Sequence, residues 1–303
     1  MKVRLGTRGS RLALVQAEAI AAGLVARGAE PEIVTIRTSG DQLAQVALAD
    51  FGGKALFVKE VEEALLEGRV DVGVHSLKDM PAHVPPALCL AAFPPREDPA
   101  DVLVTRDGRT LEELPAGAVV GTSSLRRRVL LLARRPDLRA EPIRGNVDTR
   151  LRKLEDGAYD AVVLARAGLL RLGVAPPGAV RLDPESFLPP PGQGVLGVEA
   201  RAADRALVAL LGALDDTDTR RAAEAERAYL QRLGAGCHTP VAGWARREGD
   251  AIVMRGLVAS PDGLQQLTAT SRGPLSSPEA VGHAVADTLL AQGAATLLAM
   301  RTA

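Results

Sequence analysis

The sequence predicts an α/β protein of two lobes, followed by a compact α+β domain. Between residues 3 and 214, short strands rich in β-branched residues alternate with amphipathic helices, which is the pattern of strand–helix–strand units. A long helix, three strand-like runs separated by turn residues and a last helix follow. Two Pro-rich passages, 94–98 and 189–194, interrupt this order. We therefore expect the chain to cross twice between the lobes, with a cleft between them.

The two crossings divide the chain into three expected domains. A lone strand and helix after the second Pro-rich passage indicate that the chain returns to its first sheet. We therefore assign 1–95 with 195–215 to domain 1, 99–190 to domain 2 and 219–303 to domain 3.

Composition indicates an ordinary globular protein, since 47% of the 303 residues are hydrophobic and 24% are charged. Residues 1–8 carry arginines where a secretion signal needs an apolar core, and no long apolar run follows, so we expect a cytoplasmic protein without a membrane partner. A net charge of zero argues against a nucleic-acid surface, and the two cysteines and four histidines lack zinc-ligand spacing. We expect a monomer that binds no metal and no nucleic acid.

In domain 1, a polar loop joins the first strand to the first helix. We expect a strand over 3–6, a helix over 12–27 with Ser10 as its N-cap, and a strand over 32–37. Such a helix start presents free N–H groups and the positive end of a dipole, which favours anions. A further helix follows Gly52-Gly53-Lys54, a sequence that lacks the full spacing of a nucleotide P-loop. Its apolar face would comprise Phe57, Val61, Ala64 and Leu65.

Charged residues are concentrated at the end of the next strand, which we expect over 70–74. His75, Ser76, Lys78 and Asp79 precede Pro81, which cannot continue a central strand. Ligands bind at strand ends in open α/β sheets, so a carboxylate beside an ammonium is a candidate for acid–base chemistry. A solvated turn is the alternative that these residues alone leave open. A strand over 88–93 follows.

Domain 2 repeats the order of strand, polar loop and helix, with a strand over 119–121 and a helix over 125–134. Thr122, Ser123 and Ser124 supply caps, and three arginines occupy 126–128 in the first turn. Cations at this end of a helix are unfavourable to its dipole, so helix stability does not explain the three arginines, whereas a binding site for carboxylates or phosphates does. A solvated basic face is the alternative. A loop over 143–146, a helix over 148–154 bearing Arg150, a strand over 159–165 and an irregular region containing Gly168, Arg171 and Gly173 complete this domain.

The C-terminal part contains the candidate nucleophile, Cys237. We expect a strand over 195–199, helices over 204–214 and 219–233, strands over 241–246, 251–260 and 264–272, and a closing helix over 278–292. Cys237 lies in a Gly-rich loop with Arg232 and His238 nearby to favour a thiolate, although a small residue in a tight turn would look the same. A cysteine hydrolase is disfavoured, because neighbouring side chains in an extended run point apart and His238 is poorly placed as a base.

Seven motifs in order, with matching separations, carry a family resemblance. They are Thr7 to Leu14, Gly52 to Glu60, His75 to Pro81, Gly121 to Arg127, Arg144 to Val147, Pro191 to Gly194 and Gly236-Cys237. On these segments the chain resembles the hydroxymethylbilane synthase, or porphobilinogen deaminase, family. The resemblance implies two lobes similar to periplasmic solute-binding proteins. It also implies a transferase of porphyrin, tetrapyrrole and heme biosynthesis that condenses four porphobilinogen molecules head to tail, releases ammonia and frees hydroxymethylbilane by hydrolysis.

The resemblance also implies the site. Cys237 would hold a dipyrromethane cofactor, a primer built from substrate, through a thioether. Ser76, Lys78, Thr122, Ser124, Arg126 and Arg127 would surround that cofactor, and Arg8, Ser10, Arg144, Arg150 and Arg171 the incoming porphobilinogen and growing polypyrrole chain. Each pyrrole carries an acetate and a propionate, which guanidinium groups bind bidentately. Asp79 would be catalytic, because a carboxylate stabilises the cation left by ammonia and accepts the proton lost on coupling.

The chain departs from the family pattern at three positions: Asp50, Ala55 and Asp148. Asp148 places a negative charge near Arg144 and Arg150, which either weakens carboxylate binding or orders those arginines. The competing hypothesis is a non-catalytic, two-lobed protein that binds a small anion. That hypothesis explains an arginine-lined cleft but gives no role to Cys237 in domain 3.

Overall fold

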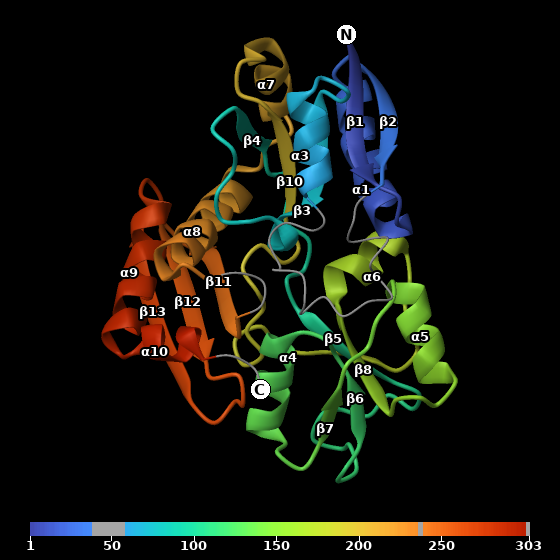
Figure 1. Cartoon of the computed structure of the whole chain (residues 1–303), viewed down its shortest axis with the longest axis vertical. Helices are drawn as coiled ribbons and strands as arrows, with labels where there is room; N and C mark the ends of the chain where they lie inside the picture. Colours follow the sequence, from blue (N-terminus) through green and yellow to red (C-terminus); the bar gives the residue numbers. More distant parts are fainter. Residues whose placement is uncertain (38–57, 236–238, 301–303) are drawn as a thin grey trace.

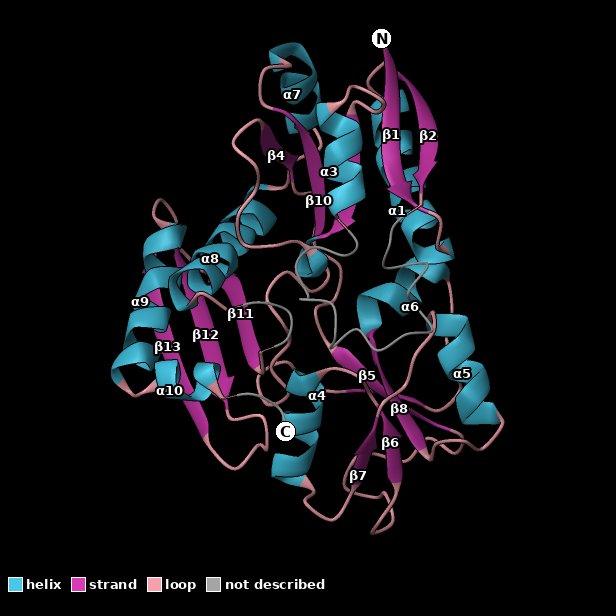
Figure 2. Cartoon of the chain, viewed as in Figure 1, coloured by secondary structure: helices cyan, strands magenta, loops and turns pink. Residues whose placement is uncertain are grey.

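The computed structural model describes residues 1–37, 58–235 and 239–300. These residues form three sheets with helices packed against them, at the top, lower right and left of Figure 1. The helices and strands are distinguished by colour in Figure 2. The expected features at 50–57 lie outside the described residues.

Lobe 1 is built on a five-stranded sheet in the order β2-β1-β3-β10-β4. Its strands are β1 (Lys2–Arg8), β2 (Glu30–Ile36), β3 (Val72–Ser76), β4 (Leu88–Ala92) and β10 (Leu196–Arg201), and its helices are α1 (Arg11–Val25), α3 (Lys59–Leu66) and α7 (Arg205–Gly212). Strand β1 pairs in parallel with β2 and β3, whereas β10 runs antiparallel to both β3 and β4. The chain therefore returns from lobe 2 and inserts a strand into the first sheet, as the sequence predicts.

Lobe 2 repeats this arrangement with the strand order β7-β6-β8-β5-β9. Its strands are β5 (Asp101–Thr105), β6 (Val119–Gly121), β7 (Arg139–Glu141), β8 (Ala161–Ala165) and β9 (Ala179–Arg181), and its helices are α4 (Leu125–Arg134), α5 (Val147–Glu155) and α6 (Arg166–Leu172). Strand β6 is parallel to β7 and β8, whereas β5 is antiparallel to β8 and β9. Strand β6 and helix α4 have the predicted bounds.

The prediction of an irregular region at Gly168, Arg171 and Gly173 is wrong. Residues 166–172 form helix α6, which ends at Gly173 in the left-handed conformation, with a φ of 64°. Gly168 conceals the helical pattern because glycine lowers helix propensity, and it lies beside Leu12 of lobe 1. Strand β5 was also missed; its apolar run, Val102 to Val104, closely follows the Pro-rich passage at 94–98.

The C-terminal part forms an antiparallel sheet in the order β11-β12-β13, covered by helices. Its elements are α8 (Thr217–Leu233), β11 (Val241–Glu248), β12 (Ala251–Ala259), β13 (Gln266–Pro274), α9 (Pro278–Ala291) and α10 (Ala294–Ala299). Helix α10 shows that α9 does not close the chain, contrary to the prediction. Helices α8 and α9 pack together around Tyr229, whose hydroxyl lies 3.1 Å from the carbonyl oxygens of Ala242 and Leu257. Among the described residues, no helix is long and apolar enough to cross a bilayer.

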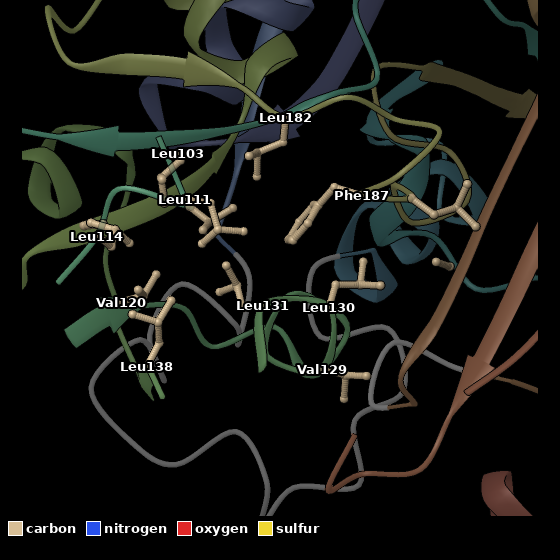
Figure 3. Packing of buried hydrophobic residues seen from close by; sticks show 14 of the residues in the cluster. Leu103, Leu111, Leu114, Val120, Val129, Leu130, Leu131, Leu138, Leu182 and Phe187 are labelled. Carbon is tan, nitrogen blue, oxygen red and sulfur yellow. The ribbon is translucent and has the colours of Figure 1, made fainter. Parts of the chain in front are cut away.

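The core of lobe 2 continues into the C-terminal sheet. Leu103, Leu131 and Phe187 lie in one buried cluster with Ala242 and Leu257. Figure 3 shows the lobe 2 members of this cluster around helix α4. The predicted fold class, two α/β lobes and a C-terminal α+β domain, is therefore confirmed, with a shared core between the second and third units.

Replacing Leu131 with alanine tests this core. Leu131 is 1% exposed, so Leu131→Ala should lower the free energy of unfolding by about 2–5 kcal/mol through lost burial and a residual cavity. Urea unfolding followed by circular dichroism measures the change. Arg128→Ala, at an exposed position on the same helix, should change it by less than about 0.5 kcal/mol.

Candidate active site

The site in lobe 1 begins where strand β3 ends. A short 3-10 turn, η3 (Leu77–Asp79), follows and places Lys78 and Asp79, both partly buried, at the carboxyl end of the strand. The amide of Leu77 donates to the carbonyl oxygen of Val195 at 3.0 Å, which ties this turn to the returning chain. The Ser76 hydroxyl lies 3.0 Å from Nε2 of Gln16 on α1.

Lys78 lies among charges of both signs. Burial lowers its pKa to about 8, which Asp79 and Asp101 oppose and which repulsion from Arg126 and Arg127 reinforces. Its ammonium donates to Oε1 of Gln193 at 3.1 Å. The side chain therefore joins the lobe 1 turn to the charged groups of lobe 2.

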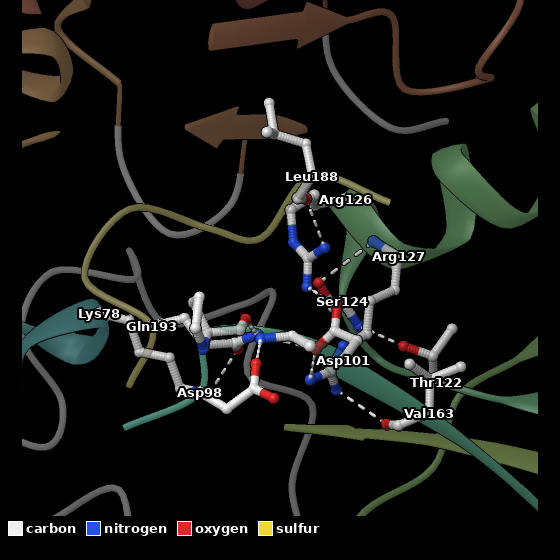
Figure 4. A network of polar contacts seen from close by, with 12 residues as sticks. Lys78, Asp98, Asp101, Thr122, Ser124, Arg126, Arg127, Val163, Leu188 and Gln193 are labelled. Carbon is white, nitrogen blue, oxygen red and sulfur yellow. Dashed lines mark hydrogen bonds and ion pairs between the residues drawn. The ribbon is translucent and has the colours of Figure 1, made fainter. Parts of the chain in front are cut away.

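The site in lobe 2 is organised by Asp101, whose carboxylate is fully buried. Arg126 and Arg127, in the first turn of α4, donate to its two oxygens through Nη2 at 2.6 and 2.7 Å (Figure 4). Each guanidinium also donates to a main-chain carbonyl, that of Leu188 or that of Val163. These two cations hold the pKa of Asp101 well below its usual range against the opposing effect of burial.

Two hydroxyl groups shape the start of α4. Ser124 is the N-cap and accepts from the Arg127 amide at 3.4 Å, while Thr122 Oγ1 accepts from the Ser124 amide at 3.2 Å. The predicted Ser124 cap is confirmed. Both residues belong to the polar network of Figure 4.

Gln193 bridges the two lobes and is fully buried. While its oxygen accepts from Lys78, its Nε2 donates to Oδ1 of Asp101 at 2.9 Å and to the carbonyl of Pro99 at 2.7 Å. Gly192 and Gly194 flank it with φ angles of 78° and 85°. A Cβ at these glycines would lie 2.8 Å from the Lys78 amide nitrogen and 2.2 Å from the Glu97 oxygen, so only glycine fits.

A small cavity of about 40 Å³ opens between the lobes beside this network. Its lining includes Gln16, Ser76 and Lys78 from lobe 1, Gly168 and Arg171 from lobe 2, and Gly192 from the returning chain. Arg171, on α6, donates to the carbonyl of Gly194 at 2.7 Å, and burial lowers its pKa. Arg150, on α5, has a pKa lowered to about 10 by burial and by the charge of Arg127.

Other predicted residues lie at or between the ends of strands and helices. Arg8 ends β1 and Ser10 caps α1 by accepting from the Ala13 amide at 3.3 Å, as predicted. Arg144 lies between β7 and α5. Asp148 forms an ion pair with Arg11 of lobe 1 at 3.3 Å, so this departure from the family pattern links the lobes. Asp50, Ala55, Phe57 and Cys237 lie outside the described residues.

Sequence reasoning missed Asp101 and Gln193. Asp101 gave one signal, a carboxylate directly before the apolar run of β5. Gln193 stood inside a recognised motif, Pro191 to Gly194, but nothing in the sequence shows that its partners lie 92 and 115 positions away.

Two α/β lobes that bring a lysine and a hydroxyl group of one together with arginines and hydroxyl groups of the other suit an anionic ligand, and this protein has an additional C-terminal domain. The family described as "Porphobilinogen deaminase, dipyromethane cofactor binding domain" matches residues 3–209, and "Porphobilinogen deaminase, C-terminal domain" matches residues 219–291. The chain belongs to the porphobilinogen deaminase family.

Individual relatives agree with this assignment. The chain is 49% identical to the porphobilinogen deaminase of Desulforudis audaxviator, over 98% of this chain and 97% of that one. It is 50% identical to that of Syntrophotalea carbinolica, over 98% and 95%. Among solved structures, it is similar to the methionine binding protein MetQ, with a TM-score of 0.45 and 16% identity over 70% of this chain and 89% of that one.

The lowered pKa of Lys78 can be measured directly. In protein labelled with ¹³C-lysine, the Cε resonance of Lys78 should titrate near pH 8, because burial disfavours the ammonium. Unfolded lysine titrates near 10.4, so the unfolded chain binds more protons between about pH 8 and 10.4, and the contribution of Lys78 to stability should rise with pH across that window. Lys78→Arg assigns the resonance, and a midpoint near 10.4 would contradict the expectation.

Proposed function

We propose that this chain is a hydroxymethylbilane synthase that condenses four porphobilinogen molecules head to tail, releases ammonia and frees hydroxymethylbilane by hydrolysis. The carrying observation is family membership across 3–209 and 219–291, which includes a dipyromethane cofactor binding domain. The site supports it, because Lys78 and Asp79 lie at the end of β3 near the buried guanidiniums of α4. The proposal includes action as a cytoplasmic monomer without nucleic acid, metal or membrane partner.

The residues at the cleft suit a dipyrromethane, which carries acetate and propionate groups. The Nε atoms of Arg126 and Arg127 are buried without a hydrogen-bond partner among the described residues, and Lys78 adds a third cation. When bound through a thioether to Cys237, the cofactor supplies the terminal pyrrole carbon to which the first substrate unit is joined. We propose that Ser76, Lys78, Thr122, Ser124, Arg126 and Arg127 hold its polar groups.

Asp79 is the proposed catalytic residue. Each condensation breaks the C–N bond of one porphobilinogen, forms a C–C bond and leaves one ring proton to be removed. As ammonia leaves, positive charge develops on the substrate, and the Asp79 carboxylate stabilises it. The same oxygen atoms accept the ring proton, and Lys78 beside them binds a carboxylate of the cofactor.

The other arginines are proposed to bind substrate and growing chain. Arg171 lines the cavity and Arg150 lies near enough to Arg127 for their charges to interact. Arg8 and Arg144 would add positive charge, and the Ser10 hydroxyl would add a hydrogen-bonding group. The three-domain division at 1–95 with 195–215, 99–190 and 219–303 remains our proposal, supported by the return of β10 to the first sheet.

Asp79→Asn tests the catalytic assignment. Asparagine keeps the shape and hydrogen bonding but carries neither the charge nor the proton, so kcat should fall about 100-fold or more. Ammonia release and circular dichroism on the purified variant measure turnover and folding. Near wild-type turnover in folded Asp79→Asn protein would refute the role.

The intact mass of the purified protein tests the cofactor. The mass should exceed that of the sequence by one dipyrromethane, and Cys237→Ser should abolish the excess, because an alcohol is a much weaker nucleophile than a thiolate. Cys89→Ser is the matched control, since Cys89 is the free cysteine of lobe 1 and should leave the excess in place. A bare-chain mass in freshly made wild-type protein would favour the non-catalytic anion-binding hypothesis.

A further inference from the structure

Arg227, on α8, contacts the chain directly after η3, the turn that carries Asp79. Its Nη1 donates to the carbonyl of Pro81 at 3.1 Å and its Nη2 to the carbonyl of Ala82 at 2.7 Å. Arg227 is partly buried, and burial lowers its pKa, which the carboxylate of Glu199 partly offsets. One guanidinium of the C-terminal unit therefore holds two consecutive carbonyl groups just beyond Asp79.

Other residues of α8 contact the same passage of lobe 1. Arg220 donates to the carbonyl of Ala91 at 3.0 Å and lies over the ring of Phe93 at 4.9 Å. Gln231 lies 3.4 Å from Nδ1 of His83. Residues 220, 227 and 231 are seven and four apart and so share one helix face. This face of α8 is seated on the passage from Pro81 to Phe93.

The other flank of the turn is held from within lobe 1. His75 and Glu199 are both buried, and their side chains meet at 3.1 Å across the β3–β10 pair. Next to them, the Leu77 amide donates to the Val195 carbonyl. The sheet therefore fixes the start of the turn, while Arg227 fixes its end.

We propose that Arg227 is a positioning residue that fixes the turn carrying Asp79 relative to helix α8, a role that rests on the function proposed for Asp79. Helix α8 ends at Leu233, four positions before Cys237 in the sequence. The same rigid helix thus holds the loop after the proposed catalytic carboxylate and leads to the proposed attachment residue. A misplacement of about 1 Å between reacting groups lowers rates about 100-fold, so this link has a kinetic consequence.

The test uses the holoenzyme and two variants of helix α8. Arg227→Met keeps the length of the side chain but removes both donors, and Arg221→Met is the matched control because Arg221 pairs with Asp218 on its own helix. In Arg227→Met, amide hydrogen exchange of 77–83 should be about 10-fold faster, kcat should fall about 10- to 100-fold, and KM should change little. The mass increment on Cys237 should be retained. Arg227→Lys, which can reach one carbonyl, should restore part of both effects.

Three results would overturn the proposal: equal exchange of 77–83 in both methionine variants, faster exchange with unchanged kcat, or loss of the mass increment in Arg227→Met. If Arg227→Met does not fold, Arg227→Lys carries the same comparison. The exchange measurement needs no substrate. A wild-type protein that consumes no porphobilinogen would therefore refute the proposed function, while the exchange result would still report whether Arg227 holds the turn.

Discussion

The carboxylate of Asp101 is the interaction on which the site depends. It is fully buried, and burial of an unpaired carboxylate has a high free-energy cost. Two guanidiniums and the Gln193 amide offset this cost by donating hydrogen bonds to it. Two cations against one carboxylate leave the cluster positive, and Lys78 adds to that charge across the lobe boundary. Removing one partner from such a buried group typically costs about 3–5 kcal/mol. The positive charge of the site and the stability of the fold therefore depend on the same few atoms.

This arrangement changes the role expected for Arg126 and Arg127. The sequence suggests guanidinium groups open to bidentate binding, but their Nη atoms already donate to Asp101 and to main-chain carbonyls. Their Nε atoms are buried and have no hydrogen-bond partner among the described residues. The arginines at the start of α4 are thus explained, at least in part, by an internal carboxylate.

Local patterns predicted most of the fold, whereas long-range pairings were not visible in the sequence. Strand β6 and helix α4 have the predicted bounds because β-branched residues, caps and helical periodicity agree there. Helix α6 was missed because Gly168 lowers the helix propensity of its segment. Lys78, Asp79 and the α4 arginines could be nominated from strand-end and helix-start positions. Asp101 and Gln193 could not, because their function arises from partners 25 to 115 positions away.

The passage from Pro189 to Gly194 is hydrogen-bonded to lobe 1, to lobe 2 and to the C-terminal unit. Arg96 donates to the Gln193 carbonyl at 2.9 Å and to Glu226 of α8 at 2.6 Å, and Glu226 accepts from the Gly192 amide. The Gln193 side chain meanwhile holds Lys78 of lobe 1 and Asp101 of lobe 2. Separating the lobes at this point breaks one of those two bonds. Asp101 would keep Arg126 and Arg127 as partners, whereas Lys78 would lose the hydrogen bond that its ammonium makes to Gln193. A separation of the lobes that makes room for a longer ligand therefore costs least free energy when a ligand carboxylate replaces Gln193 as the partner of Lys78. Opening of the lobes and binding of an anion then favour each other.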